Sequence, residues 1–70
     1  MERELVELIN GIVNDAAVSI DSAYFRLLRE KNVVDAEDKD LNALVSALNE
    51  SRNSFKTVVN KVNSLVDRTY

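Results

Sequence analysis

Apolar residues in the second half of the chain repeat every seven positions from Leu41 onward. The leading positions of the repeat are Leu41, Leu48, Phe55 and Val62. Further apolar residues follow at helical spacing, namely Leu44, Val45, Val58, Val59, Leu65 and Val66. This spacing places them on one side of an α-helix and predicts a buried seam. Only Ser51 and Arg52 stand where the repeat calls for apolar residues.

The first half carries a matching pattern, in which apolar residues alternate by three and four positions, as in a paired helix. Its inward-facing set is Leu5, Val6, Ile9, Ile12, Val13, Ala16, Ala17, Ile20, Ala23, Tyr24, Leu27 and Leu28. Acidic residues open this segment and basic residues close it, as the helix dipole favours. We therefore predict a helix over about residues 2–31, weakened only at Gly11.

A short connection is predicted at residues 32–35. Asn32 readily adopts the left-handed conformation that ends helices, and Asp35 is a suitable N-cap for the next one. The sequence after this point contains no Gly or Pro, so a second helix should run over about residues 36–69. Because a connection of about four residues reverses the chain, the helices should lie antiparallel within a single all-α domain at residues 1–70.

The polar stretch at residues 49–54 leaves a second architecture open. A break there would give a monomeric three-helix bundle, whereas an unbroken helix gives a hairpin of two helices of similar length. In a hairpin, the apolar arc on each helix is wider than the area that two helices in contact can cover. We therefore expect two hairpins to pack together as a homodimeric four-helix bundle.

The amino-acid composition lacks the residue types on which most catalytic mechanisms depend. The chain has no Cys and no His, so disulfides and thiolate metal sites are excluded and the commonest general base and metal ligand are missing. The acidic residues at 35–40 do not match a calcium loop, because Ala43 replaces the turn glycine and Asn49 the closing glutamate. These acidic residues are instead explained by the first turn of a helix, where negative charge is favoured. We expect a protein with no enzyme activity, no cofactor and no metal.

Charge and hydropathy narrow the choice of partner and location. The net charge of −3 disfavours binding to nucleic-acid backbones or anionic membranes. The apolar runs are too short to span a membrane, and the N-terminus lacks the features of a signal peptide, so we expect a cytoplasmic protein.

Nucleic-acid binding is the second hypothesis, because of the length of the chain and the predicted shape of the dimer. A homodimeric helical hairpin of this length resembles, in architecture alone, the plasmid-encoded repressor-of-primer family, which binds RNA. That resemblance implies an RNA- or DNA-binding regulatory dimer. The basic residues of the second predicted helix, however, form no continuous stripe and no row of aromatic side chains accompanies them.

The first helix carries a second apolar stripe. Gly11, Val18 and Phe25 are seven residues apart and should line the face opposite the seam. An aromatic residue among small neighbours is an efficient anchor for a partner. Ordinary scattered exposure of apolar residues, or packing of this stripe within the dimer, would explain the same pattern. The functional hypothesis is a partner-binding surface centred on Phe25, with Val18, Ser22 and Arg29 around it.

The interruption of the seam is the other candidate feature. With the turn at residues 33–34, Arg52 should lie roughly opposite residues 15–17, where its head group reaches either water or the Asp15 carboxylate. Together with Ser51, such a polar group at the centre of a dimer would fix the register of the helices. The sequence as a whole predicts a regulator, adaptor or inhibitor that binds a larger protein as a homodimer, with a structural subunit of a larger assembly as a third hypothesis.

Overall fold

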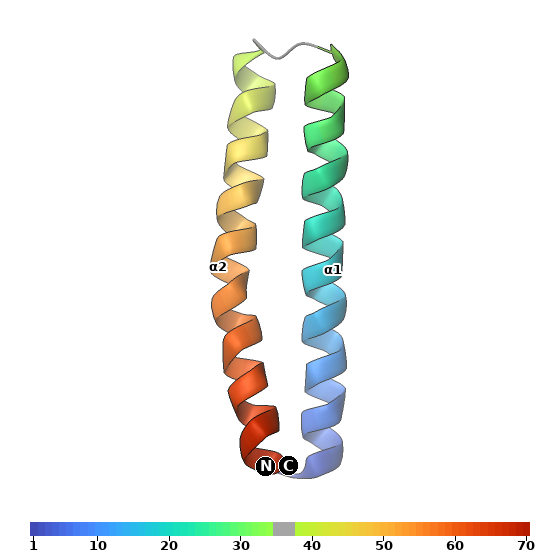
Figure 1. Cartoon of the computed structure of the whole chain (residues 1–70), viewed down its shortest axis with the longest axis vertical. Helices are drawn as coiled ribbons and strands as arrows, with labels where there is room; N and C mark the ends of the chain where they lie inside the picture. Colours follow the sequence, from blue (N-terminus) through green and yellow to red (C-terminus); the bar gives the residue numbers. More distant parts are fainter. Residues whose placement is uncertain (35–37) are drawn as a thin grey trace.

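A computed structural model describes residues 1–34 and 38–70 of the chain. These residues form two α-helices, α1 at Arg3–Val34 and α2 at Lys39–Thr69, and no strand. Figure 1 shows the helices side by side and antiparallel, with both chain termini at the same end. We call this the terminal end and the opposite one the connected end. The predicted all-α helical hairpin is confirmed.

The first helix is longer than the sequence suggested. α1 continues to Val34, past the predicted end at Lys31, and Asn32 is part of it. No described residue has a positive φ angle, so the left-handed ending predicted at Asn32 is wrong. The helix passes Asn32 because no Gly or Pro is there to stop it, and Asn alone is a weak signal.

The second helix begins at a different cap from the one predicted. Asp35 lies outside the described residues, and Asp38 is the N-cap of α2. Its backbone is extended, with φ −65° and ψ 114°, and its Oδ1 accepts a hydrogen bond from the Leu41 amide at 3.0 Å. This bond satisfies one of the free amides of the first turn.

α2 runs without a break through the polar stretch at residues 49–54. Ser51 Oγ donates a hydrogen bond to the Ala47 carbonyl at 3.2 Å, so its hydroxyl is satisfied within the helix. The three-helix alternative is therefore wrong. α1 also passes through Gly11 unbroken, at a point where an added Cβ would meet nothing within 4 Å.

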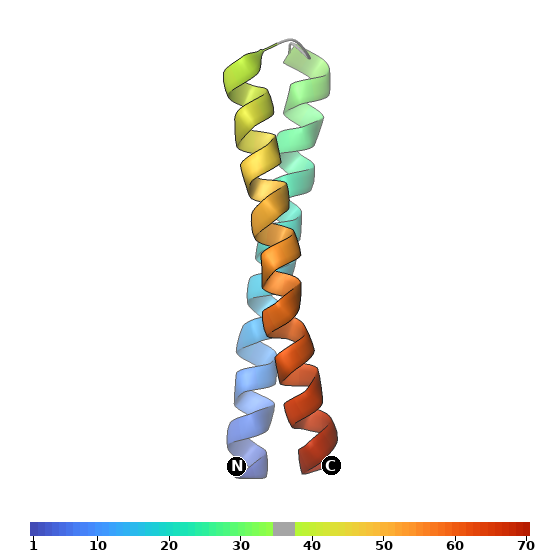
Figure 2. The same ribbon diagram turned by 90° about the vertical axis from the view of Figure 1, so that its left-hand side faces the viewer.

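The predicted seam forms the contact between the helices, which cross at a shallow angle (Figure 2). Among the described residues only Val6, Val45 and Val62 are buried. Half-buried apolar side chains complete the contact: Ile9, Val13, Ala16, Ala17, Ile20, Tyr24, Leu27 and Leu28 from α1, and Leu41, Leu48, Phe55, Val59, Leu65 and Val66 from α2. A single layer of side chains between two helices leaves little fully enclosed volume.

Polar contacts close the terminal end of the hairpin. The Tyr70 hydroxyl donates a hydrogen bond to the Glu7 carboxylate, and the Arg3 guanidinium lies 4.3 Å from the centre of the Tyr70 ring. Arg3 Nε is also 3.8 Å from Glu7 Oε1. The hydrogen bond with Tyr70 raises the pKa of Arg3 above its usual value. These exposed contacts hold the end of α2 beside the start of α1.

The hairpin is a thin rod that exposes more surface than a compact chain of its size. Its Cα extents are 49 × 15 × 13 Å, and its radius of gyration is 15.9 Å, against about 11 Å for a globular domain of this length. The accessible surface is 5283 Å², whereas a compact monomer of this mass exposes about 4,400 Å². About 900 Å² of surface is thus in excess.

Candidate interaction surfaces

One side of the hairpin is apolar. In α1, Leu5, Leu8, Ile12 and Ala23 share one flank of the seam, since Ala23 follows Ile12 by three helical turns. In α2, Leu44, Ala47 and Val58 share a flank at similar spacing. All seven residues are exposed. We call this set of residues the apolar face.

Two open hollows show that the two flanks lie on the same side of the molecule. One, of about 650 Å³, brings Ile20 of α1 beside residues of α2. Its lining is Ile20, Ala47, Glu50, Ser51, Ser54, Phe55 and Val58. The other, of about 410 Å³, lies nearer the connected end and is lined by Ala23, Arg26, Leu27, Glu30 and Leu48. Small side chains such as Ala23, Ala47 and Ser54 create these depressions.

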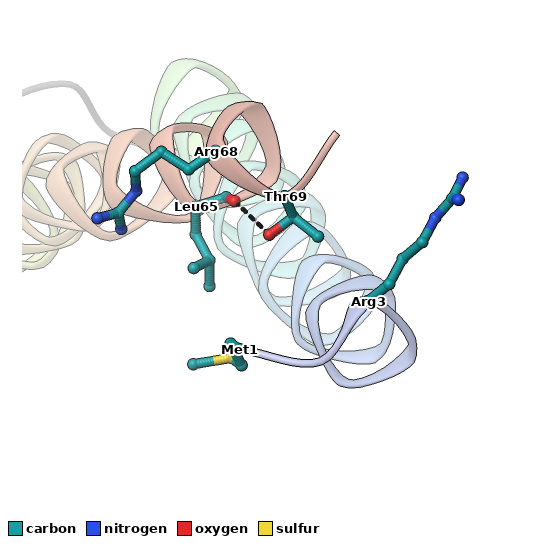
Figure 3. Close-up of a pocket in the computed structure, with 5 residues that line it drawn as sticks. All are labelled: Met1, Arg3, Leu65, Arg68 and Thr69. Carbon is teal, nitrogen blue, oxygen red and sulfur yellow. Dashed lines mark hydrogen bonds between the residues drawn. The ribbon is translucent and has the colours of Figure 1, made fainter.

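A third hollow, of about 590 Å³, lies at the terminal end between Met1, Arg3, Leu65, Arg68 and Thr69. Figure 3 shows the Leu65 side chain pointing toward Met1, while Arg3 points away. Thr69 Oγ1 donates a hydrogen bond to the Leu65 carbonyl at 2.8 Å, which satisfies the hydroxyl within α2. The hollow is therefore bordered by the apolar Leu65 and Met1 together with the polar Arg3, Arg68 and Thr69.

Exposure on the apolar face is high for large side chains. Leu8 is 60% exposed, Ile12 59% and Leu44 58%. Single exposed apolar residues are normal, but contiguous apolar patches on small proteins mark interaction sites. The sequence analysis missed Leu8, although its spacing of three from Leu5 and four from Ile12 was a usable signal.

The side of the hairpin that carries Arg52 differs from the apolar face, because its side chains form polar and aromatic contacts with one another. Arg52 Nε donates to Asp21 Oδ1 at 2.8 Å and its Nη1 to Asn49 Oδ1 at 3.3 Å. The guanidinium carbon lies 4.4 Å from the Tyr24 ring centre and 5.0 Å from that of Phe25. The two rings meet edge to face, with centres 5.3 Å apart. We call these five residues the Arg52 cluster.

The structure does not bring the predicted register residues together. Arg52 pairs with Asp21, not with Asp15, which is exposed. The reason is the later connection, because α1 extends to Val34 and a later turn shifts every cross-helix pair along α1. Ser51 lines a hollow of the apolar face, whereas Arg52 contacts the Tyr24 and Phe25 rings.

The predicted partner-binding residues lie together on α1. Phe25 is 54% exposed and Val18 68%, and Ser22 and Arg29 are exposed at helical spacing around Phe25. Phe25 does not lie opposite the seam as predicted, because its ring reaches the Arg52 guanidinium of α2. The aromatic side chain therefore sits at the edge of the hairpin and is held there by both helices.

The structure adds no candidate for metal chemistry. Within residues 1–34 and 38–70, no three acidic side chains converge into a group that could hold a cation. In the same described part of the chain, neither helix contains an apolar segment long enough to cross a membrane. No protein-family model, curated protein or solved structure matches the chain.

Proposed function

We propose that this protein is a small non-catalytic module that works as a homodimer and binds another protein. The apolar face joins the two copies, and the surface around Phe25 contacts the partner. The exposed apolar face is the observation that carries the proposal. A hairpin with three buried side chains among its described residues lacks the core that usually stabilises a domain of this length.

Self-association supplies the missing core. Burying a Leu, Ile or Val side chain contributes about 1.5–3 kcal/mol relative to leaving it exposed. Leu5, Leu8, Ile12, Leu44 and Val58 are available for such burial in each copy. No other surface among the described residues offers a comparable set, so dimerisation through this face is the most effective route to a stable fold.

The surface around Phe25 suits a protein partner. Phe25 is exposed, but the Tyr24 ring and the Arg52 guanidinium restrict its motion. An anchor that is already ordered loses less side-chain entropy on binding. Aromatic and Arg side chains are also the types most often found to dominate protein interfaces. The expected partner presents an apolar pocket that accepts the Phe25 ring.

Sedimentation equilibrium at micromolar concentration tests the dimer. We expect a mass twice that of the 7.9 kDa chain together with a helical circular dichroism spectrum. A well-folded species at the mass of one chain would overturn the proposal.

The partner surface is tested by Phe25→Ala. A pull-down from native cell extract with the unaltered protein identifies the partner, and isothermal titration with that partner then compares the two proteins. We expect at least about tenfold weaker binding for Phe25→Ala, with helicity and dimer mass unchanged, because the anchor is lost and the apolar face is intact. Equal affinity would remove Phe25 from the binding surface.

A further inference from the structure

We infer that the two copies pack apolar face to apolar face with their connected ends at opposite ends of the bundle. This inference rests on the proposed homodimer and specifies its geometry. The Arg52 clusters would then emerge on opposite sides of the dimer, near the middle of the bundle. Such an arrangement presents two identical partner surfaces and makes the module bivalent.

Surface area points to a second copy as the occupant of the apolar face. The hairpin exposes about 900 Å² more than a compact monomer of its mass. A stable protein interface buries about 800 Å² on each partner. Face-to-face packing of two hairpins would therefore remove an area of the size that a dimer requires and bring each chain to an ordinary exposure.

Charge along the rim of the apolar face points to the same occupant. On α2, Asp40 and Glu50 precede Lys61 and Arg68 along this flank. Any two-fold packing of one apolar face on another lays antiparallel helices across each other, because the two helices of each hairpin run in opposite directions. Acidic segments of one copy then meet basic segments of the other.

α1 repeats this order only in part, with Asp15 in its first half and Arg26 in its second. Glu30 lies one turn from Arg26 and offsets its charge. The rim of α2 thus changes from acidic to basic along the described residues, whereas the rim of α1 changes from acidic to neutral, so the charge pattern of α2 is complementary to itself.

Two orientations of the dimer are possible, with the connected ends of the two copies either together or at opposite ends. Side-chain volume decides between them. The terminal half of the face carries large residues, namely Leu5, Leu8, Ile12 and Val58. The half near the connected end has Leu44 but otherwise small residues, Ala23 and Ala47, and the hollow of about 410 Å³ beside Ala23. Hollows border both halves, but the larger apolar side chains of the face lie in its terminal half and the smaller ones mainly in the half near the connected end.

If the connected ends lay together, α1 of one copy would pack on α2 of the other. The large side chains of the two terminal halves would then meet at one end of the bundle, and the small side chains near the two connected ends would leave gaps at the other. Protein interiors are packed at nearly uniform density, so both overpacking and voids destabilise.

If the connected ends lie at opposite ends, α1 packs on α1 and α2 on α2. Leu8 and Ile12 of each copy then face the hollow lined by Ala23 and Leu27 of the other. Asp40 of one copy also faces Arg68 of the other, since these residues lie equally far from the midpoint of α2. This orientation fills both ends evenly and is the one we infer.

Cysteine pairing separates the two orientations, and the native chain has no Cys to interfere. Ser54 is at the midpoint of α2 and lines the apolar face, and Ser19 follows Ile12 by one heptad near the midpoint of α1. In the inferred dimer, each of these residues faces its own copy across the two-fold axis. In the other orientation, Ser19 of one copy faces Ser54 of the second.

The experiment mixes differently tagged Ser19→Cys and Ser54→Cys proteins, lets the subunits exchange, and treats them with a short bismaleimide. We expect covalent dimers of like chains, at least about tenfold more abundant than dimers of unlike chains. Ser64→Cys, which lies off the apolar face, is the control and should remain uncrosslinked. Sedimentation of each untreated variant reports whether a dimer is present.

The outcomes distinguish the two levels of the proposal. Dimers that crosslink mainly between unlike chains would overturn the inferred orientation and leave the homodimer intact. Dimers that crosslink in neither way would show that the apolar face is not the interface, and this result would also overturn the inferred orientation. A monomer in sedimentation for the unaltered protein would overturn the proposed function itself.

Discussion

The apolar face and the Arg52 cluster are built from the same two helices, yet their side chains are satisfied in different ways. Arg52 finds Asp21 and Asn49 within its own chain. Leu8 and Ile12 are 60% and 59% exposed and have no covering side chains over most of their surface. A polar group can be satisfied by one well-placed neighbour, whereas an apolar surface has to be covered by other apolar surface.

This difference suggests separate roles for the two regions. In the Arg52 cluster, the charge of Arg52 is paired within the hairpin and links α2 to α1, while the Phe25 ring stays exposed for a partner. The apolar face is incomplete and calls for a second molecule. Substitutions in the two regions should therefore have effects of different kind and size.

The largest effect is expected from Ile12→Glu on the apolar face. It would place an unpaired charge in the dimer core of each copy, which costs several kcal/mol. We expect the dimer dissociation constant to rise more than about 100-fold, with loss of helicity at micromolar concentration. Sedimentation and circular dichroism measure the two effects.

Val18→Glu is the matched control for Ile12→Glu. Val18 is a β-branched residue of the same helix and is 68% exposed against 59% for Ile12, but it lies off the apolar face. Its replacement should change stability by less than about 0.5 kcal/mol and leave the mass unchanged. Similar losses in the two variants would mean that the apolar face is not the special surface of the molecule.

A smaller effect is expected from Asp21→Ala in the Arg52 cluster. Removing the carboxylate leaves the half-buried Arg52 guanidinium without its charged partner, which should lower the free energy of unfolding by about 1 kcal/mol. The dimer mass should not change. Urea denaturation of Asp15→Ala, an exposed Asp on the same helix, provides the comparison and should show a change within about 0.5 kcal/mol. A larger loss at Asp15 than at Asp21 would contradict the Arg52–Asp21 pairing.

The sequence was sufficient for the two helices and their seam because heptad spacing extends through both segments. It was not sufficient for the connection. Asp35 and Asp38 are both suitable N-cap residue types, so the sequence alone does not choose between them, and the structure shows Asp38 as the N-cap of α2. With the turn expected too early, Arg52 was assigned to Asp15, although the carboxylate it contacts belongs to Asp21.

The surface around Phe25 shows the same limit. Helical spacing grouped Val18 and Phe25 correctly on one side of α1. Spacing alone could not reveal that the Phe25 ring reaches across to Arg52, because a long side chain on the neighbouring helix determines that contact. Likewise, spacing alone could not show that the flanks of α1 and α2 join into one apolar face, because this depends on how the two helices are rotated relative to each other.

The smallest effect is expected at Gly11, which belongs neither to the apolar face nor to the Arg52 cluster. Gly in a helix interior costs about 1 kcal/mol relative to Ala, and a Cβ added at Gly11 would meet nothing within 4 Å. Gly11→Ala should therefore raise the free energy of unfolding by about 0.5–1 kcal/mol per chain, measured by urea denaturation at fixed protein concentration. Because the gain comes from backbone entropy and not from contact, the dimer mass and partner affinity should stay the same. A loss of stability or a change in mass would place Gly11 against another chain and would extend the interface beyond the apolar face.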